Sequence, residues 1–221
     1  MSARERILAR LRAAEPGAPV MPPDVTAYYA QRPRLTPGER LQQLCARLRA
    51  SRADVMVVQP AEWARVAADA LHLRGVRRLA LNSGVRADEL AAALPPTIEA
   101  VRFDGAIEAW KQDMFATVDA GFTPAAAGIA ATGALLLNHG GALPRTLSLV
   151  PPISLVCIDA RDLYDDLHHA SSSQRWADDM PTNRVLVSSP SRTADIQQTL
   201  AYGAHGPREL VVVVIADGDT A

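Results

Sequence analysis

The sequence predicts an α/β fold in which helices cover both faces of a mainly parallel sheet. Three observations support this fold class. From residue 54 onward, short apolar runs of strand length alternate with segments of helical periodicity. Residues 184–215 follow the order strand, turn, helix, turn and strand within about 30 residues, the size of one parallel crossover unit. The 221 residues are 48% hydrophobic but only 5% aromatic, which suits one aliphatic core.

The beginning of the chain is predicted to be an appendage to this core. Ser2 and Glu5 match a capping box, which indicates a short N-terminal helix. Six prolines within residues 15–37 predict an extended arm after that helix. We therefore divide the chain into an N-terminal helix with a Pro-rich arm, residues 1–35, and an α/β domain, residues 36–221.

The elements of the domain follow from capping signals and apolar periodicity. Thr36 and Glu39 form a second capping box, with Pro37 at the first helical position, and this predicts a helix to about residue 50. Strands are expected at residues 54–58, 78–81, 98–101, 133–138, 153–158, 184–187 and 210–215. Helices are expected at residues 61–73, 87–93, 107–114 and 161–170, with residues 116–120 extended and an Ala-rich helical turn beginning at residues 123–124.

Composition and charge exclude several classes of partner. The 23 basic and 24 acidic residues give a net charge of −1, so the chain lacks the electrostatic footprint of a protein that binds nucleic acid or an anionic membrane. Its longest apolar run is far shorter than the ~20 residues that cross a bilayer, and we expect no membrane insertion. Charged residues interrupt the apolar positions near the N-terminus, which argues against a secretory signal and predicts a cytoplasmic protein.

The two cysteines argue against an intrinsic redox centre. Cys45 falls on the apolar face of a predicted helix and Cys157 lies in a predicted strand, so both are interpreted as buried small hydrophobic residues. An iron–sulfur cluster typically needs four thiolates, and no metal-ligand pattern occurs elsewhere in the sequence. We expect no intrinsic cofactor and no metal site.

The most informative candidate site lies in residues 188–207. Hydroxyl side chains, among them Ser191 and Thr193, gather around Arg192 where a helix is predicted to begin. The unpaired N–H groups of such a helix point into the turn before it, and they can hold an anion there. This segment therefore indicates a binding site for a small anionic ligand.

The other polar residues of this segment allow a structural alternative. Asp195 suits the first turn of the predicted helix, where the helix dipole favours a carboxylate by ~0.3–1 kcal/mol. His205 and Gly206 follow the predicted helix end, where the histidine can donate to terminal carbonyls. Ser191 or Thr193 can likewise be an ordinary helix cap. The alternative leaves unexplained why four hydroxyls and an arginine gather at one turn.

A second group of candidate residues lies in the middle of the chain. Thr132 and Gly133 stand at the start of a predicted strand, where a glycine lets the backbone approach a ligand closely. Arg145 follows in a loop and can hold a carboxylate or phosphate in a bidentate grip, although a solvated arginine is an equal alternative. We interpret Gly140 and Gly141 as a turn. The sequence has no signature of a Ser-His-Asp triad, a Walker loop or a dinucleotide-binding loop, and no catalytic residue is assigned.

Three stretches, taken together, point to a family. They are SARERILARLRAA at the N-terminus, IAATGALLL followed by LPRTLSLVPP in the centre, and SSPSRTADIQQTLAYGAHGPREL near the C-terminus. In this order they resemble the lactate utilisation protein C family, whose shared module is the LUD domain, over nearly the whole chain. The resemblance implies an α/β sandwich similar to the sugar-phosphate isomerase and CoA-transferase type. It also implies a bacterial system that oxidises L-lactate to pyruvate, in which partner proteins carry the iron–sulfur clusters.

The sequence departs from the family pattern at four positions. Ala131 takes the place of an acidic residue in the central motif, and Ala134 takes the place of a hydroxyl residue. A histidine is usual after the proline of the next loop, where this chain continues to Ser154. Ser189 stands where the family has a glycine. If the family's chemistry depends on that acid or that histidine, this protein has lost it.

These observations lead to one main hypothesis and two alternatives. The main hypothesis is a cytoplasmic accessory subunit of a lactate-oxidising system, with iron–sulfur proteins as partners and a small carboxylate or phosphate as a candidate ligand. The alternatives are a stand-alone enzyme that acts on a phosphorylated or CoA-linked small molecule, and a non-catalytic regulatory or scaffold protein. Whether the chain is an enzyme stays open. The candidate ligand-binding residues are Thr132, Gly133, Arg145, Ser191, Arg192, Thr193, Asp195, His205 and Gly206.

Overall fold

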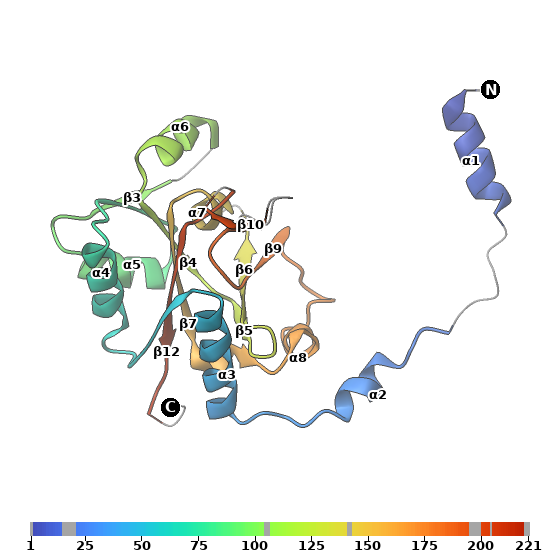
Figure 1. Cartoon of the computed structure of the whole chain (residues 1–221), viewed down its shortest axis with the longest axis horizontal. Helices are drawn as coiled ribbons and strands as arrows, with labels where there is room; N and C mark the ends of the chain where they lie inside the picture. The colour runs from blue at the N-terminus through green and yellow to red at the C-terminus, as the bar shows by residue number, and fades with distance from the viewer. Residues whose placement is uncertain are drawn as a thin grey trace. The chain divides into compact units, whose positions relative to one another are not determined.

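The chain divides into two compact units, residues 1–33 and residues 34–221. The structure is a computed structural model, and it describes residues 2–14, 21–103, 107–140, 143–194, 200–203 and 205–218. The first unit holds the helices α1 (Ala3–Ala13) and α2 (Val25–Ala30). The second unit holds all the sheets and the remaining helices among the described residues (Figure 1).

The two helices of the first unit are capped by side chains. The capping box of α1 forms as predicted, because the Glu5 N–H donates to the Ser2 hydroxyl and the Ser2 N–H donates to the Glu5 carboxylate. The prediction of an extended arm is wrong at α2. There the Asp24 carboxylate accepts from the Ala27 N–H at 2.9 Å and caps a six-residue helix.

The larger unit is built on a six-stranded parallel sheet with the strand order β1-β12-β7-β4-β2-β3. Its strands are β1 (Asp54–Val58), β2 (Arg78–Leu81), β3 (Glu99–Arg102), β4 (Ala120–Pro124), β7 (Ile153–Asp159) and β12 (Glu209–Ile215). Every pair of neighbours runs parallel. The predicted α/β class with a mainly parallel sheet is therefore confirmed.

The fold contains a second sheet, whereas the sequence predicts one sheet covered by helices on both faces. Its strand order is β8-β5-β6-β9, and the strands are β5 (Ala127–Ile129), β6 (Ala134–His139), β8 (Leu163–Tyr164) and β9 (Asn183–Val187). Strands 133–138 and 184–187 were expected in one sheet with the others, but they pair antiparallel to each other here. Residues 184–215 are therefore not a parallel crossover, because β9 and β12 belong to different sheets.

Helices and the second sheet cover the two faces of the parallel sheet. The helices are α3 (Pro37–Ala50), α4 (Trp63–Leu73), α5 (Val85–Ala93), α6 (Ile107–Thr117), α7 (Thr146–Leu149), the 3-10 turn η1 (Ala160–Asp162) and α8 (Leu167–Ser173). Figure 1 shows α4 and α5 on one side of the parallel sheet, and the second sheet with α8 on the other. Among the described residues, none of these helices is long and apolar enough to span a bilayer.

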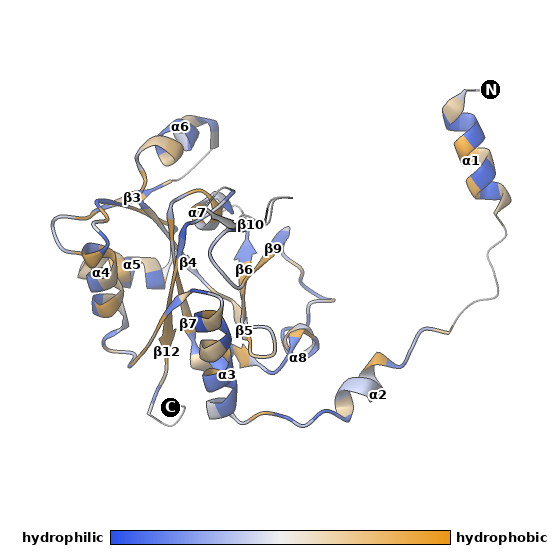
Figure 2. Ribbon diagram, viewed as in Figure 1, coloured by the Kyte–Doolittle hydropathy of each residue, from blue (hydrophilic) through white to orange (hydrophobic). Residues whose placement is uncertain are grey.

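The alternation of side chains along β7 divides the core into two main clusters. Leu155 and Cys157 face α4 and α5, where they pack with residues such as Phe122. Val156 and Ile158 face the opposite way and pack with α3, β6 and β12. The hydropathy colouring in Figure 2 shows the apolar strands at the centre of this unit. Burial raises the pKa of the Cys157 thiol to about 12, and Cys45 is buried as well, in agreement with the sequence-based interpretation of both cysteines.

Three local predictions are wrong, and in two of them strand pairing overrides local propensity. Residues 116–120 are not one extended segment, since α6 continues to Thr117 and β4 begins at Ala120. The Ala-rich stretch after residue 124 forms β5 instead of a helical turn, because its backbone pairs with β6. The helix expected at residues 161–170 is split into η1, β8 and α8, because the second of these pairs with β5.

The helix predicted after Ser191 is also absent from the described residues. Its two ends form the strands β10 (Arg192–Ala194) and β11 (Leu200–Tyr202), which pair antiparallel. Backbone contacts hold the ends of this segment together, because the Ser191 N–H donates to the Pro207 carbonyl and the Gly203 N–H donates to the Ser191 carbonyl. The anion site at a helix N-terminus, which the sequence predicted here, is replaced by a strand pair.

Candidate ligand site

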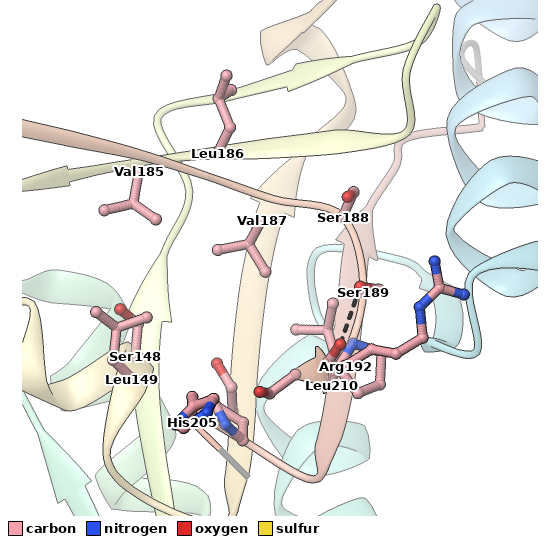
Figure 3. Close-up of a pocket in the computed structure, with 15 residues that line it drawn as sticks. Ser148, Leu149, Val185, Leu186, Val187, Ser188, Ser189, Arg192, His205 and Leu210 are labelled. Carbon is pink, nitrogen blue, oxygen red and sulfur yellow. Dashed lines mark hydrogen bonds between the residues drawn. The ribbon is translucent and has the colours of Figure 1, made fainter. Parts of the chain in front are cut away.

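A cavity of about 290 Å³ lies between the two sheets, next to the N-terminal ends of β7 and β12 (Figure 3). It is bounded by β9, by the chain that follows β9, by α7 and by the loop before β12. Its lining residues are Ser148, Leu149, Ser154, Val185, Leu186, Val187, Ser188, Ser189, Pro190, Ser191, Arg192, His205, Gly206, Pro207 and Leu210. Arg192 and His205 are the only ionisable side chains among these lining residues.

The backbone around Ser191 brings the two halves of the C-terminal motif to the cavity. The Ser191 N–H donates to the Pro207 carbonyl at 2.8 Å. A Cβ atom on Gly206 would lie 3.2 Å from the Ser191 Cβ, which is tighter than ordinary contact. The absence of a side chain at Gly206 therefore lets this loop pack closely against Ser191.

Four of the predicted site residues meet in this cavity, namely Ser191, Arg192, His205 and Gly206. Arg192 and His205 are exposed, so they lie at the open rim. In Figure 3 the Arg192 guanidinium points away from Ser148, toward the opposite side of the view. The backbone of Thr193 pairs with Ala201 in the β10–β11 pair. Asp195 lies outside the described residues.

The predicted site residues of the central motif, Thr132, Gly133 and Arg145, do not line this cavity. Thr132 is exposed in the turn between β5 and β6. Gly133 is buried with a φ of +69°, and a Cβ atom there would lie 2.5 Å from the Arg47 Cβ on α3. Gly133 therefore serves the packing of α3 on the second sheet. Arg145 is exposed beside α7, and only its backbone connects to the cavity, because its carbonyl accepts from the Ser148 hydroxyl at 3.1 Å.

Two residues that were not among the predicted site residues lie beside or within this cavity. Ser148 lines the cavity and is 2% exposed, and its hydroxyl oxygen lies 3.4 Å from the Nε2 atom of His139. His139 is 3% exposed, and its Nδ1 atom lies 3.3 Å from the Leu143 carbonyl oxygen. A carbonyl only accepts, so Nδ1 carries the proton and Nε2 is left as an acceptor for Ser148. The spacing of nine residues between the two gave no recognisable sequence signal.

Burial favours the neutral form of the His139 ring. Loss of hydration lowers the pKa of His139, the hydrogen bond to Leu143 opposes this shift, and the charge of Arg145 adds to it. A neutral imidazole next to a serine hydroxyl can orient that hydroxyl and accept its proton. The buried end of the cavity therefore combines a hydroxyl group with a neutral base.

The lowered pKa of His139 predicts a loss of stability in mild acid. The unfolded chain binds the proton near pH 6.5, whereas the folded chain binds it at lower pH, so stability is full above about pH 6.5 and falls as the pH drops below it. The pKa of His169 is lowered in the same direction by burial and by Arg34, so it contributes to the same slope. Urea unfolding measures this dependence. Between pH 7.5 and 5, the free energy of unfolding should decrease less in the His139→Gln variant than in the unaltered chain.

The control for this prediction is His72→Gln, at an exposed histidine on α4. In this variant the urea concentration at the midpoint should change with pH as it does in the unaltered chain. A midpoint that does not change between pH 7.5 and 5 in the unaltered chain would contradict the prediction.

A second cavity, of about 270 Å³, lies at the C-terminal ends of β1, β7 and β12. Arg86 is its most buried cation, and the Asp159 carboxylate accepts from it at 2.8 and 3.0 Å. Glu89 accepts from the same guanidinium at 3.1 Å, and the guanidinium also lies 5.3 Å from the centre of the Trp63 ring. Because Arg86 is already paired within the chain, this cavity offers a weaker anion site than the first.

The sequence matches known proteins over most of its length. The family model described as LUD domain matches residues 41–215, which include every lining residue of the first cavity. An uncharacterized protein of Neisseria meningitidis is 41% identical over 221 aligned residues, which cover 97% of this chain and 94% of that protein. Lactate utilization protein C of Halalkalibacterium halodurans is 31% identical over 107 residues, which cover 45% of each chain.

The fold also has a counterpart among solved structures. The crystal structure of a DUF162 family protein from Deinococcus radiodurans superposes with a TM-score of 0.59 at 24% identity. The superposition covers 82% of this chain and 99% of that one. At this identity the likeness shows the fold alone.

Proposed function

Because the chain belongs to the LUD domain family, we propose that it acts in lactate utilisation, as a cytoplasmic accessory subunit that works with iron–sulfur partner proteins. The family resemblance of the sequence motifs is confirmed by these matches. The name of the H. halodurans relative supports the lactate-related role. The presence of only two cysteines, both buried, supports the proposal that any iron–sulfur cluster belongs to the partners.

The observation that carries a ligand-binding role is the meeting of Arg192, His205 and Ser191 at one small cavity. Arg192 supplies a cation and several N–H donors at the rim, and His205 supplies a further donor. The surrounding hydroxyls can accept or donate. A cavity of about 290 Å³ suits a small metabolite, and its rim suits a carboxylate. The ligand we propose is therefore a short carboxylate of the kind that lactate oxidation consumes or forms.

The accessory role is tested in the native host. Deletion of the chain should impair growth on L-lactate, and an affinity-tagged copy should restore growth and co-purify with iron–sulfur proteins. If the deletion strain grows normally on lactate and no iron–sulfur protein co-purifies, the accessory role is wrong.

The ligand-binding role predicts a strong effect of Arg192→Ala. Loss of the charge-assisted hydrogen bonds to a carboxylate, worth roughly 1.5–3 kcal/mol, should raise the Kd for L-lactate about tenfold or more. Isothermal titration of the purified chain with L-lactate measures this. The matched control is Arg65→Ala, because Arg65 is an exposed arginine of α4 whose guanidinium pairs with Glu62 and Asp69 on the same face of the protein surface. An Arg192→Ala variant with unchanged affinity would contradict the assignment.

A stand-alone enzyme is the second candidate, and the pair of Ser148 and His139 favours it. A serine hydroxyl beside a neutral imidazole is the arrangement that activates a nucleophile in acyl transfer. The two candidates differ in a simple assay. Turnover of a CoA ester or phosphate ester by the purified chain without partners would favour the enzyme, and the absence of turnover together with partner binding would favour the accessory subunit.

A further inference from the structure

One side of β9 is an open strand edge. Within the described part of the chain, β9 pairs with β6 alone, and residues 183–187 make no further main-chain hydrogen bond on the other side. Residues 185–188 all line the first cavity, although neighbouring residues of a strand point to opposite faces. Figure 3 shows Val185 and Val187 on one side of the strand and Leu186 on the other. The cavity therefore extends along the open edge of β9.

The hydrogen bonds of β6 indicate which backbone groups of β9 are unpaired. The Leu136 carbonyl accepts from an N–H of the chain just before β5, so the backbone of Leu136 is directed toward β5. Backbone directions alternate along a strand, so the residues on either side of Leu136 bond to β9, where their register partners are Val185 and Val187. The N–H and C=O groups of Arg184 and Leu186 therefore point to the open edge.

The other outer strands of the two larger sheets are protected against pairing with a further chain. β8 has only two residues. β3 carries exposed charged side chains at both ends, Glu99 and Arg102. In β1 the Arg49 guanidinium donates to the Val55 carbonyl at 3.0 Å and covers that edge. β9 instead presents Leu186, which is apolar and 50% exposed. An open apolar edge of this kind accepts an additional strand from another chain.

The charges beside this edge favour an acidic segment. The ionisable side chains of β9 and of the cavity lining are Arg184, Arg192 and His205, and none of them is acidic. The Arg184 guanidinium lies 4.2 Å from the centre of the Trp176 ring, and its Nη1 atom has no hydrogen-bond partner among the described residues. Burial lowers the pKa of Arg184, and the charge of Asp179 opposes this shift only in part. A second copy of the chain would bring the same cations together, so a different protein is the better partner.

We infer that β9 is a docking edge for an extended, acidic segment of a partner protein, which adds to the second sheet as a further strand. This inference rests on the proposed function, because the accessory role requires iron–sulfur proteins that contact this chain. Main-chain hydrogen bonds to Arg184 and Leu186 supply affinity, and carboxylates of the segment bind the cations beside the edge.

The test uses affinity-tagged copies of the chain in the native host. Leu186→Pro removes an outward N–H but no hydrogen bond to β6, and proline is tolerated at such edge positions. It should lower the amount of co-purified iron–sulfur protein about tenfold or more. The matched control is Leu186→Ala, which shortens the same side chain but keeps the N–H, and it should retain most of the partner. Thermal unfolding checks that both variants are folded.

Hydrogen exchange provides a second measurement that needs no variant. In the free chain the N–H groups of Arg184 and Leu186 should exchange rapidly with solvent, and in the purified complex they should exchange about tenfold more slowly or less. The edge strand β3 is the internal control, and its exchange should be the same in both samples. Raising the salt concentration should weaken the complex, because the expected contacts at the cations are partly exposed.

The outcomes separate this inference from the proposed function. If the unaltered chain captures no iron–sulfur protein, the accessory role is wrong and the inference is wrong with it. If the partner is captured equally by Leu186→Pro, and exchange along β9 is not slowed, the docking edge is wrong while the accessory role stands. Equal losses in Leu186→Pro and Leu186→Ala overturn strand addition, and a complex insensitive to salt overturns the acidic segment.

A second copy of the chain is the remaining occupant that the experiment can detect. If the unaltered chain alone forms a dimer in sedimentation and Leu186→Pro is a monomer, the edge binds its own copy and the assignment to a partner protein is overturned. Loss of the iron–sulfur partner in Leu186→Pro, its retention in Leu186→Ala and slowed exchange along β9 together support the inference.

Discussion

Gly121→Ala should destabilise the protein by about 3 kcal/mol or more, in the upper range for overpacked sites. An added Cβ would lie 1.9 Å from the Leu147 carbonyl oxygen and 3.0 Å from the Leu147 carbonyl carbon. Both are backbone atoms of α7, and no side-chain rotation can remove the clash. The helix must therefore move away from β4. Because Ser148 follows Leu147 directly, this movement should also separate Ser148 from His139 and weaken ligand binding.

Urea unfolding of Gly121→Ala measures the destabilisation as a lower midpoint concentration of urea with an unchanged m-value. The control is Gly38→Ala in the first turn of α3, where an added Cβ meets no atom within 4 Å. That substitution should leave stability unchanged or raise it by up to about 1 kcal/mol, because alanine favours the helical backbone. A Gly121→Ala variant as stable as the unaltered chain would show that α7 does not rest on β4 as described.

Phe122→Ala should cost about 3–5 kcal/mol, as is typical of removing a fully buried aromatic ring. Phe122 is 0% exposed and is among the largest fully buried side chains. Its ring stacks on Trp63 of α4 with 6.1 Å between the ring centres, and this contact fastens the helix layer to the parallel sheet. The cavity left behind cannot be filled by the surrounding strands without moving the sheet.

The matched substitution for this prediction is Phe115→Ala on α6. Phe115 is 65% exposed, so its removal should change the free energy of unfolding by less than about 0.5 kcal/mol. The two variants are compared by urea unfolding under the same conditions. A cost below 1 kcal/mol for Phe122→Ala would contradict the core described here.

The strands of the parallel sheet could be predicted because their signal is local. The runs at residues 54–58 and 210–215 are short and strongly apolar, and they match β1 and β12 to within one residue. Capping boxes likewise identified the starts of α1 and α3, since each depends on residues only three positions apart. The division of the strands into two sheets could not be predicted, because it depends on which distant strands pair.

The Ala-rich segment before β6 also shows that local propensity does not predict pairing between distant strands. Alanine has the highest intrinsic helix propensity, yet residues 127–129 form a strand because β6 and β8 pair with them on either side. The segment after Ser191 was predicted as a helix for a similar reason, and its ends instead pair as β10 and β11. In both cases a pairing between separate parts of the chain outweighs a weak local preference.

The candidate site likewise contains some residues that a local motif predicts and others that depend on contacts between distant segments. Ser191, Arg192, His205 and Gly206 were singled out from one sequence motif, and they meet because that motif folds back on itself. Thr132 and Gly133 were singled out as well, but they serve a turn packed on α3. Ser148 and His139 carry no site signal in the sequence, and Ser154 stands out there only as a departure from the family pattern.

The sequence by itself determined the family, the α/β class and the residues at the rim of the cavity, because each of these is carried by motifs or periodicities of neighbouring residues. Only the tertiary structure decided the buried end of the cavity. Ser154 from β7 and Ser148 from α7 line it, and His139 from β6 lies against Ser148. The physical reason is that burial and hydrogen-bond partnership are properties of contacts between distant segments, which no local pattern specifies.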